Sequence, residues 1–387
     1  MLRLQSPYPW IRFKAQCFSR DLEKVFNYEP GGHHPVHLGD RLGDGGKYKV
    51  IHKLGYGGFG TVWLCHVLDP MPKYVALKII MARFYGDDCP ELKVNKLSQL
   101  KIDNDSICLP LDQFKMKGPN GEHWCFVYPL AGPPVSSITQ EFKDQRTLQS
   151  MALQAVKALA SLHSHGICHG DFIPRNVLVR MTGLDGLSEE KVIEILGEPI
   201  KSEVTTYSGQ PLPGTARKYL VDSIDFYDLD PQFLTDQIYV IDFGESFDLS
   251  HPPKTLGTPR SYCAPELLLG EPPSIASDLW ALAFLMLGPL PEPWWSTTWE
   301  GCRDWFQDEP DSEWRAVQKD LTPVKEIRAV EDLLKLGVEV EGEIRDISQE
   351  EVKVLGDLLR QLTRFRPEER LSIKGVQEHE WFSLESS

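Results

Sequence analysis

The first third of the chain contains several runs whose hydrophobic positions indicate strands. Residues 48–54 alternate between polar and apolar side chains, and residues 61–65 and 75–80 are short apolar runs. Residues 123–128 predict one more strand, and residues 129–134, rich in proline and glycine, follow it as a linker. The chain therefore begins with a β-rich region.

Hydrophobic positions at helical spacing predict helices further along the chain. Residues 140–164 form the longest such pattern, through Leu148, Met151, Leu153, Val156, Leu159 and Leu162. Residues 90–100 form a shorter helix that a proline can open, and residues 188–197 have a serine cap and a final glycine. Residues 279–290 are strongly apolar but shorter than the roughly 18 residues that span a bilayer, so they predict a buried helix.

Length, charge and cysteine spacing narrow the class of protein. With 387 residues and 41% hydrophobic content, the chain can form one large domain of two lobes or two ordinary domains. Its net charge of −15 argues against a nucleic-acid partner and suits a basic protein substrate, although acidity also serves solubility. The eight cysteines lack metal-ligand spacing, so we expect reduced thiols in an intracellular protein. Because no apolar run reaches the length that spans a bilayer, we expect no membrane partner.

A glycine-rich turn, Gly55-Tyr56-Gly57-Gly58-Phe59-Gly60, joins the first two predicted strands. Such a turn lets backbone N–H groups approach phosphate oxygens, although many other hairpins also contain glycines. Around it we expect an adenine pocket, with backbone groups of the linker meeting the adenine edge. The residues assigned to this pocket are Leu54, Val62, Ala76, Tyr128, Leu130 and Ala131.

Lys78 is the only cation in the apolar run 75–80. A lysine in a central strand is costly to bury unless it meets an anion, and the natural partners are nucleotide phosphates and a helix carboxylate. Glu91, at the start of the predicted helix 90–100, is our candidate for that carboxylate. The alternative is that Glu91 only stabilises the helix N-terminus through the macrodipole.

The strongest chemical signal lies at residues 167–179. Asp171 follows a histidine by two positions and precedes Asn176 by five, a spacing that suits phosphoryl transfer. Asp171 can accept a hydroxyl proton while Asn176 reaches a metal. Asp242, in an Asp-Phe-Gly turn after a β-branched run, can complete an Mg²⁺ site. The two pieces together, in this order, predict a kinase.

Three further charged residues are expected to be structural. Glu266 lies in an Ala-Pro-Glu sequence and Arg370 in an Arg-Pro-Glu-Glu-Arg sequence, and we predict a buried bidentate pair between them. Two solvated surface charges are the alternative. Asp278 is expected to hold the backbone of the catalytic loop, rather than only to cap a helix.

From residue 31 to 382 the chain resembles eukaryotic protein kinases, and specifically fungal relatives of the SR-protein kinases. The most specific similarity is the block 31–40 together with 48–65. The resemblance implies an α+β, bilobal fold with a small β-rich N-lobe and a larger, mainly helical C-lobe. It also implies MgATP as phosphate donor and serine or threonine in arginine/serine-rich proteins as acceptor.

The domain boundaries follow from this resemblance. We expect an N-terminal extension and leading loop at 1–47, an N-lobe with hinge at 48–131, a C-lobe at 132–382 and a tail at 383–387. Within the C-lobe, 182–237 is an insert with partial structure. We expect a monomer in the cytoplasm or nucleus, with a mitochondrial presequence at 1–20 as the alternative. The acidic cluster 308–313 is a candidate docking site for a basic peptide, and a solvated acidic loop is the alternative.

Two departures from the family pattern leave alternatives open. Ile173 stands where such kinases have a lysine that faces the γ-phosphate, and Gly170 stands where many have an arginine that meets a phosphorylated activation segment. The second departure suggests that activation does not require loop phosphorylation. The first favours a slow kinase, because losing one preorganised charge typically costs about 10²- to 10³-fold in rate. A nucleotide-binding pseudokinase and an aminoglycoside- or choline-type small-molecule phosphotransferase are the alternatives.

Overall fold

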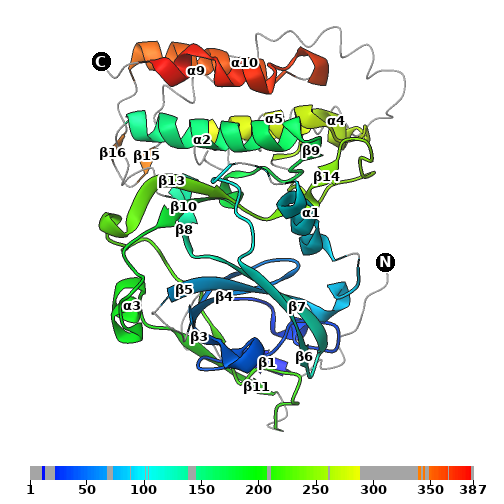
Figure 1. Ribbon diagram of the computed structural model, residues 1–387, viewed down its shortest axis with the longest axis vertical. Helices are drawn as coiled ribbons and strands as arrows, with labels where there is room; N and C mark the ends of the chain where they lie inside the picture. Colours follow the sequence, from blue (N-terminus) through cyan, green and yellow to red (C-terminus); the bar gives the residue numbers. More distant parts are fainter. Residues whose placement is uncertain are drawn as a thin grey trace. The chain divides into compact units, whose positions relative to one another are not determined.

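The computed structural model describes residues 11–13, 22–67, 73–87, 89–100, 102, 104–137, 145–206, 211–259, 262–287, 339–340, 343–344, 348–364 and 366–384. The acidic cluster 308–313 lies outside the described residues. The chain divides into two compact units (Figure 1). The first comprises Met1–Val94, Cys108–Gly132 and Arg180–Thr235, and the second comprises Asn95–Ile107, Pro133–Val179 and Asp236–Ser387.

A six-stranded antiparallel sheet forms the centre of the first unit. Its order is β2-β3-β4-β5-β7-β6, with β2 Arg41–Leu42, β3 Tyr48–Tyr56, β4 Gly60–Val67, β5 Lys73–Ile80, β7 Gly121–Pro129 and β6 Asp112–Gly118. All four predicted strands are confirmed. Strand β6 was not predicted, because it is a mostly polar edge strand with only Phe114 and Met116 packed against the core.

The register of this sheet separates its two faces. Val62 lies opposite Lys78, and Ala76 lies opposite Tyr128, so these residues share one face. The other face carries the fully buried Trp63 and packs into a hydrophobic core. That core is completed by Val36 from the leading loop, by Val221 from the insert and by Tyr48, Val50, Cys65, Val67, Val75, Leu77, Ile79, Cys125 and Val127.

The insert contributes much of its structure to the first unit, although the sequence placed 182–237 in the second lobe. Helix α3, Glu189–Leu196, is capped by Ser188 and ends at Gly197, as predicted. Lys49 of β3 forms an ion pair with Glu189 at 2.7 Å. Strands β11 Lys201–Thr206 and β12 Tyr219–Val221 form an antiparallel sheet with β1, Ile11–Phe13.

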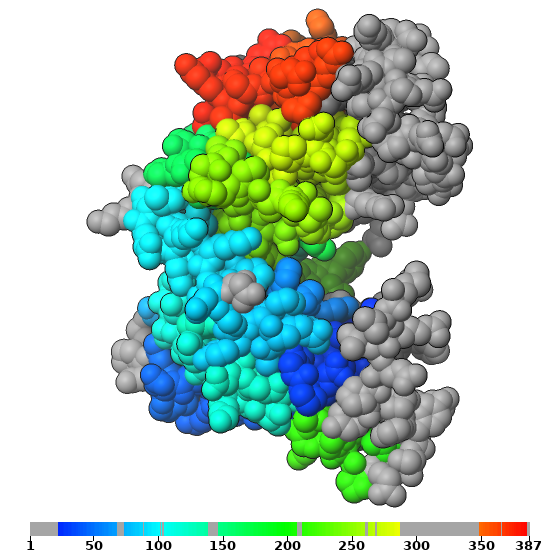
Figure 2. All heavy atoms as spheres, turned by 90° about the vertical axis from the view of Figure 1, so that its right-hand side faces the viewer, coloured from blue at the N-terminus to red at the C-terminus, as the bar shows by residue number. Residues whose placement is uncertain are grey.

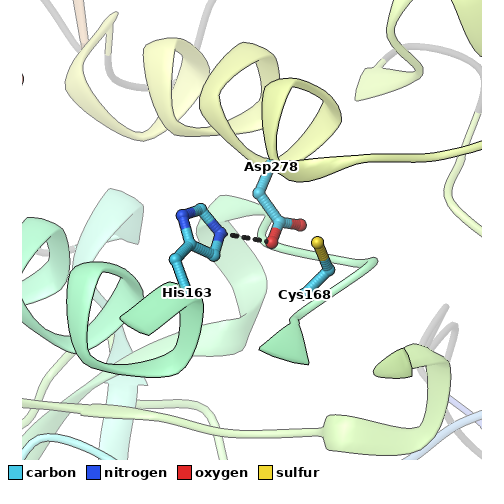
Figure 3. Close-up of side chains that lie close together, drawn as sticks. All are labelled: His163, Cys168 and Asp278. Carbon is cyan, nitrogen blue, oxygen red and sulfur yellow. Dashed lines mark hydrogen bonds and ion pairs between the residues drawn. The ribbon is translucent and has the colours of Figure 1, made fainter. Parts of the chain in front are cut away.

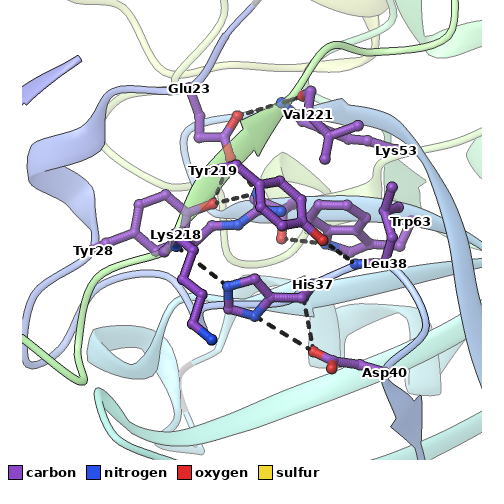
Figure 4. A network of polar contacts seen from close by, with 12 residues as sticks. Glu23, Tyr28, His37, Leu38, Asp40, Lys53, Trp63, Lys218, Tyr219 and Val221 are labelled. Atoms are coloured by element: carbon purple, nitrogen blue, oxygen red, sulfur yellow. Dashed lines mark hydrogen bonds and ion pairs between the residues drawn. The ribbon is translucent and has the colours of Figure 1, made fainter. Parts of the chain in front are cut away.

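A buried ionic network joins the N-terminal extension and the insert to the central sheet (Figure 4). The Glu23 carboxylate pairs with the Lys53 ammonium and, at 3.0 Å, with Arg217 Nη1, and all three side chains are 0% exposed. Tyr28 donates its hydroxyl proton to the same carboxylate. Burial raises the pKa of Glu23, but Lys53 and Arg217 outweigh that effect and hold the pKa below its ordinary value. The Arg217 guanidinium also stacks over the Trp63 ring, 4.7 Å from its centroid.

Buried histidines in the first unit should make its stability depend on pH. Burial lowers the pKa of His33 and of His52 to about 4 each, because the charged imidazolium loses its hydration. An unfolded histidine has a pKa of about 6.5, so its stabilising contribution is complete above that pH. The contribution is lost as the pH falls from about 6.5 to about 4, by roughly 3 kcal/mol for each histidine.

Denaturant unfolding of the first unit between pH 7 and pH 4 measures this dependence. We expect His33→Leu to reduce the slope in that window, because neither ring nitrogen of His33 has a hydrogen-bond partner among the described residues. His251→Gln, at an exposed histidine, is the control and should leave the slope unchanged. Equal slopes in His33→Leu and the parent would contradict the assignment to this histidine.

The second unit is mainly helical. Helix α2, Gln145–Ser164, packs against α5, Ile275–Leu287, and α10, Ile373–Gln377, while α9, Gln349–Leu362, packs on α5. Figure 2 shows the orange and red C-terminal residues directly against yellow residues of the same unit. The helices predicted at 140–164 and 279–290 are thus present over their described residues, and α5 begins earlier than predicted, at Ile275. Among the described residues, no helix is long and apolar enough to cross a membrane.

Short strands complete the topology. Strand β9 Ile167–Cys168 pairs with β14 Phe247–Asp248, and β15 Glu339–Val340 pairs with β16 Glu343–Ile344. A three-stranded sheet has the order β13-β10-β8, with β13 Leu234–Val240, β10 Val177–Met181 and β8 Ala131–Pro134. Two short helices remain, α1 Lys93–Gln99 and α4 Pro265–Leu268. The α+β class is confirmed, with one β-rich and one mainly helical unit.

Candidate active site

The catalytic loop runs from β9 to β10 within the second unit and holds Asp171 in a buried position. The side-chain amide of Asn176 donates to the backbone oxygen of Asp171 at 2.8 Å and to its Oδ2 at 2.9 Å. Asp171 Oδ1 is buried and has no hydrogen-bond partner among the described residues. Burial raises the pKa of Asp171 above its ordinary value, and Arg175 and Asn176 oppose that rise. An unpaired carboxylate oxygen of this kind suits a proton acceptor.

Asp278, near the start of α5, fixes the backbone of the catalytic loop as predicted. Its carboxylate accepts hydrogen bonds from the backbone N–H of His169 at 2.8 Å and of Gly170 at 2.9 Å. His163 Nε2 lies 2.9 Å from the same carboxylate (Figure 3). Burial alone would raise the pKa of Asp278, but the bonds from His163 and Gly170 outweigh it and hold the pKa low. The carboxylate therefore remains charged in the interior.

The cluster of His163, Cys168 and Asp278 in Figure 3 has the residue types of a metal site but a structural role. Burial and the neighbouring Asp278 raise the pKa of the Cys168 thiol far above its ordinary value. Because the Asp278 oxygens are already occupied by the loop N–H groups, the cluster is a packing and hydrogen-bonding centre.

Asp242 follows β13 and has the residue type that a magnesium site requires. Its backbone lies at φ 62°, ψ 70°, and it is the only non-glycine residue with positive φ among the described residues. Such a conformation costs free energy and is found mainly where function requires it. Ile241 N–H donates to Asn176 O at 2.9 Å, so Asp242 is tied directly to the catalytic loop. The amide nitrogen of Asn176 donates hydrogen bonds to Asp171. The amide oxygen of Asn176 and the carboxylate of Asp242 are oxygen ligands of the kind that fits Mg²⁺.

Gly170 cannot be replaced by arginine in this backbone. Its φ is +78°, and a Cβ at this position would lie 2.5 Å from the backbone oxygen of Glu245. The segment that follows the Asp-Phe-Gly turn is instead held by hydrogen bonds to a backbone oxygen and to a carboxylate. Thr258 donates its hydroxyl proton to Gly170 O at 2.6 Å, and Gly257 N–H donates to Glu245 Oε2 at 2.9 Å. Sequence reasoning missed Glu245, although the acid directly after Asp-Phe-Gly was a visible signal.

In the first unit, the predicted ion pair between Lys78 and Glu91 is present. Lys78 Nζ lies 2.5 Å from Glu91 Oε2, and both side chains are largely buried. Glu91 lies in the short 3₁₀ turn Pro90–Leu92 that precedes α1. Tyr128, predicted only as a pocket residue, donates its hydroxyl proton to Glu91 Oε1. Glu91 is therefore held from two sides, with Lys78 and Tyr128 on neighbouring strands of the same sheet face.

We expect Tyr128→Phe to lower kcat about fivefold while the affinity for ATP changes little. Phenylalanine keeps the ring but removes one hydrogen bond to Glu91, worth about 1 kcal/mol. Tyr74→Phe is the matched control, because the Tyr74 hydroxyl donates to Leu187 O within the same unit. Initial-rate kinetics of both variants measure the effect. An unchanged kcat in Tyr128→Phe would show that Lys78 alone positions Glu91.

The glycine-rich turn connects β3 and β4 as expected. Gly57 N–H donates to Gly60 O at 2.9 Å, which closes the hairpin. A Cβ at Gly55, Gly57 or Gly58 would meet no atom within 4 Å, whereas a Cβ at Gly60 would lie 2.2 Å from Ile79 O. The first three glycines thus leave open space beside the backbone, and Gly60 is required by packing. The open backbone fits the approach of a phosphate group.

The predicted pair of Glu266 and Arg370 is bidentate and buried. Arg370 Nη1 and Nη2 each donate to one Glu266 oxygen at 2.6 Å. Arg370 also donates to the backbone oxygens of Arg364 and Ala276, so its guanidinium connects three segments of the second unit. Of the predicted residues, Asp171, Asn176, Asp242, Asp278, Glu266 and Arg370 lie in the second unit, and Lys78, Glu91 and the glycine-rich turn lie in the first.

These elements define the fold of a protein kinase domain. A crystal structure described as a kinase domain superposes with a TM-score of 0.52 at 20% identity, covering 90% of this chain and 98% of that chain. No family model matches the sequence.

The curated relatives of the chain include serine/threonine kinases of the SR-protein kinase family. The chain is 29% identical over 187 residues to the serine/threonine-protein kinase SKY1 of Saccharomyces cerevisiae, covering 45% of this chain and 25% of that protein. It is 33% identical over 169 residues to the protein kinase dsk1 of Schizosaccharomyces pombe, covering 41% and 30%. It is 30% identical over 193 residues to human SRSF protein kinase 3, covering 46% and 33%. The chain thus spans about a quarter to a third of the length of these relatives.

Proposed function

We propose that this protein is a serine/threonine protein kinase that transfers the γ-phosphate of ATP to a protein hydroxyl with the help of Mg²⁺. The observation that carries the proposal is the buried Asp171 carboxylate, with one oxygen bound by Asn176 and the other unpaired among the described residues. Asn176 and Asp242 would hold the metal, which neutralises phosphate charge when bound. Lys78, kept in place by Glu91, would meet the phosphates of the nucleotide.

We propose arginine/serine-rich proteins as the substrate class, such as those of mRNA processing. The similarity to SRSF protein kinase 3 supports this class, and the net charge of −15 suits a basic substrate. We also propose that the protein is a monomer and that it acts in the cytoplasm or nucleus. The cysteine spacing supports the intracellular location.

Phosphate transfer from radiolabelled ATP tests both parts. The acceptors are an Arg/Ser-repeat peptide, its Lys/Ser counterpart of equal charge, and the Arg/Ala peptide that lacks hydroxyls. We expect label on serine of the Arg/Ser peptide, less on the Lys/Ser peptide and none on the Arg/Ala peptide. Equal labelling of the Arg/Ser and Lys/Ser peptides would reject the substrate class and keep the kinase activity.

A nucleotide-binding pseudokinase is the second candidate, because Ile173 is 0% exposed and brings no charge to the catalytic loop. ATP would then raise the melting temperature without any transfer to peptide. Transfer to an aminoglycoside or to choline, with none to peptide, would instead identify a small-molecule phosphotransferase. The three outcomes are mutually exclusive in one set of assays.

A further inference from the structure

The catalytic loop lacks a cation at the position of Ile173. That side chain is fully buried, as is its neighbour Phe172, and both belong to the apolar interior of the second unit. Phe172 lies against the ring of His169. A charge introduced at Ile173 would need to be desolvated, which is costly. Any positive charge that serves the transferred phosphoryl group from this loop must therefore come from another residue.

Arg175 supplies a cation at the open side of the catalytic carboxylate. It lies in the 3₁₀ turn Pro174–Asn176, four residues after Asp171, and its Nη2 is 3.6 Å from Asp171 Oδ2. Its side chain is 64% exposed, whereas that of Asp171 is 10% exposed. Among the described residues, it is the only cationic side chain within ion-pair distance of Asp171.

The geometry of this pair leaves the guanidinium available to a ligand. A separation of 3.6 Å is too long for a hydrogen bond, so the contact with Asp171 does not consume a donor. Asp171 Oδ2 already accepts from Asn176, and the Arg175 side chain contacts no other acceptor among the described residues. A guanidinium has five N–H donors in a planar fork that matches phosphate oxygens. Arg175 is thus charged, exposed and positioned beside the proton acceptor.

We propose that Arg175 is the cation of the catalytic loop that binds the transferred phosphoryl group, in the place that Ile173 leaves uncharged. The inference rests on the proposed kinase function. In the reaction, the substrate oxygen forms a bond to the γ-phosphorus while the bond from that phosphorus to the β-bridging oxygen breaks. The hydroxyl proton goes to the Asp171 carboxylate and ADP leaves. Arg175 N–H groups neutralise charge on the phosphoryl oxygens during transfer.

The test compares Arg175→Gln, Arg175→Lys and the control Lys157→Gln in the full chain. Lys157 is exposed on α2, so its variant makes the same change in net charge away from the loop. We expect Arg175→Gln to lower kcat about 10²- to 10³-fold with little change in the KM for ATP. Arg175→Lys should recover most of the loss, and Lys157→Gln should behave as the parent.

A binding measurement gives a second readout that does not depend on turnover. Calorimetry with ADP and with a non-hydrolysable ATP analogue measures how strongly each protein prefers the γ-phosphate. We expect Arg175→Gln to lose that preference while its affinity for ADP is unchanged. An Arg175→Gln variant with parental kcat and parental preference would overturn the inference and leave the kinase function intact. A parent that neither transfers phosphate nor hydrolyses ATP would overturn both.

Discussion

Replacing Asp171 with asparagine should lower kcat by a factor of about 10² to 10⁴ while nucleotide binding remains near the parental level. The amide is nearly isosteric with the carboxylate, but it cannot accept the proton of the attacking hydroxyl. Asp171 is buried and its Oδ1 has no partner among the described residues, so no hydrogen-bonded neighbour of that oxygen can take over the proton. The loss should therefore appear in kcat and not in the KM for ATP.

The measurement is steady-state transfer to the peptide substrate, together with calorimetric binding of ATP. Asp236→Asn is the matched control, because Asp236 is exposed in the same unit and away from the loop. We expect parental kinetics for that control. A kcat for Asp171→Asn within threefold of the parent would exclude Asp171 as the proton acceptor and would require another base.

Glu23→Gln should destabilise the first unit by about 3 to 5 kcal/mol. The substitution removes the carboxylate that pairs with both Lys53 and Arg217, and both cations are completely buried. Breaking one partner of a buried ion pair leaves an uncompensated charge, which is the costly outcome. Adding Lys53→Met should recover part of the loss, because it removes one of the two buried cations that lose this carboxylate and keeps an apolar side chain in the core.

Denaturant unfolding measures the loss of stability, and hydrogen exchange of the folded protein shows which segments it affects. We expect faster exchange in β12 and in residues 22–28, which the network joins (Figure 4). Glu203→Gln, on an exposed position of β11, is the control and should stay within about 0.5 kcal/mol of the parent. A Glu23→Gln variant as stable as this control would mean that Lys53 and Arg217 find other partners or lose their charge.

The candidate site was predictable because its residues are close together in sequence. The spacing of Asp171 and Asn176 places both on one short loop, and the register of adjacent strands brings Val62 beside Lys78. The ion pairs of Lys78 with Glu91 and of Glu266 with Arg370 were also predicted, since a buried charge requires a partner. The roles of Tyr128 and Glu245 were not predicted, because the sequence around a hydroxyl or an acidic side chain does not indicate which residue it will contact.

By itself, the sequence determined four of the six strands of the central sheet, the main helices and the order of the catalytic motifs, because periodicity and short spacings act over a few residues. Only the tertiary structure decided where the insert belongs. Arg217 and Val221 lie far along the chain from Glu23 and Trp63, and no local pattern records that they share one core. Lys53 shows the same limit. It alternates like a surface residue of a strand, yet it is completely buried because a carboxylate thirty positions earlier folds back to meet it.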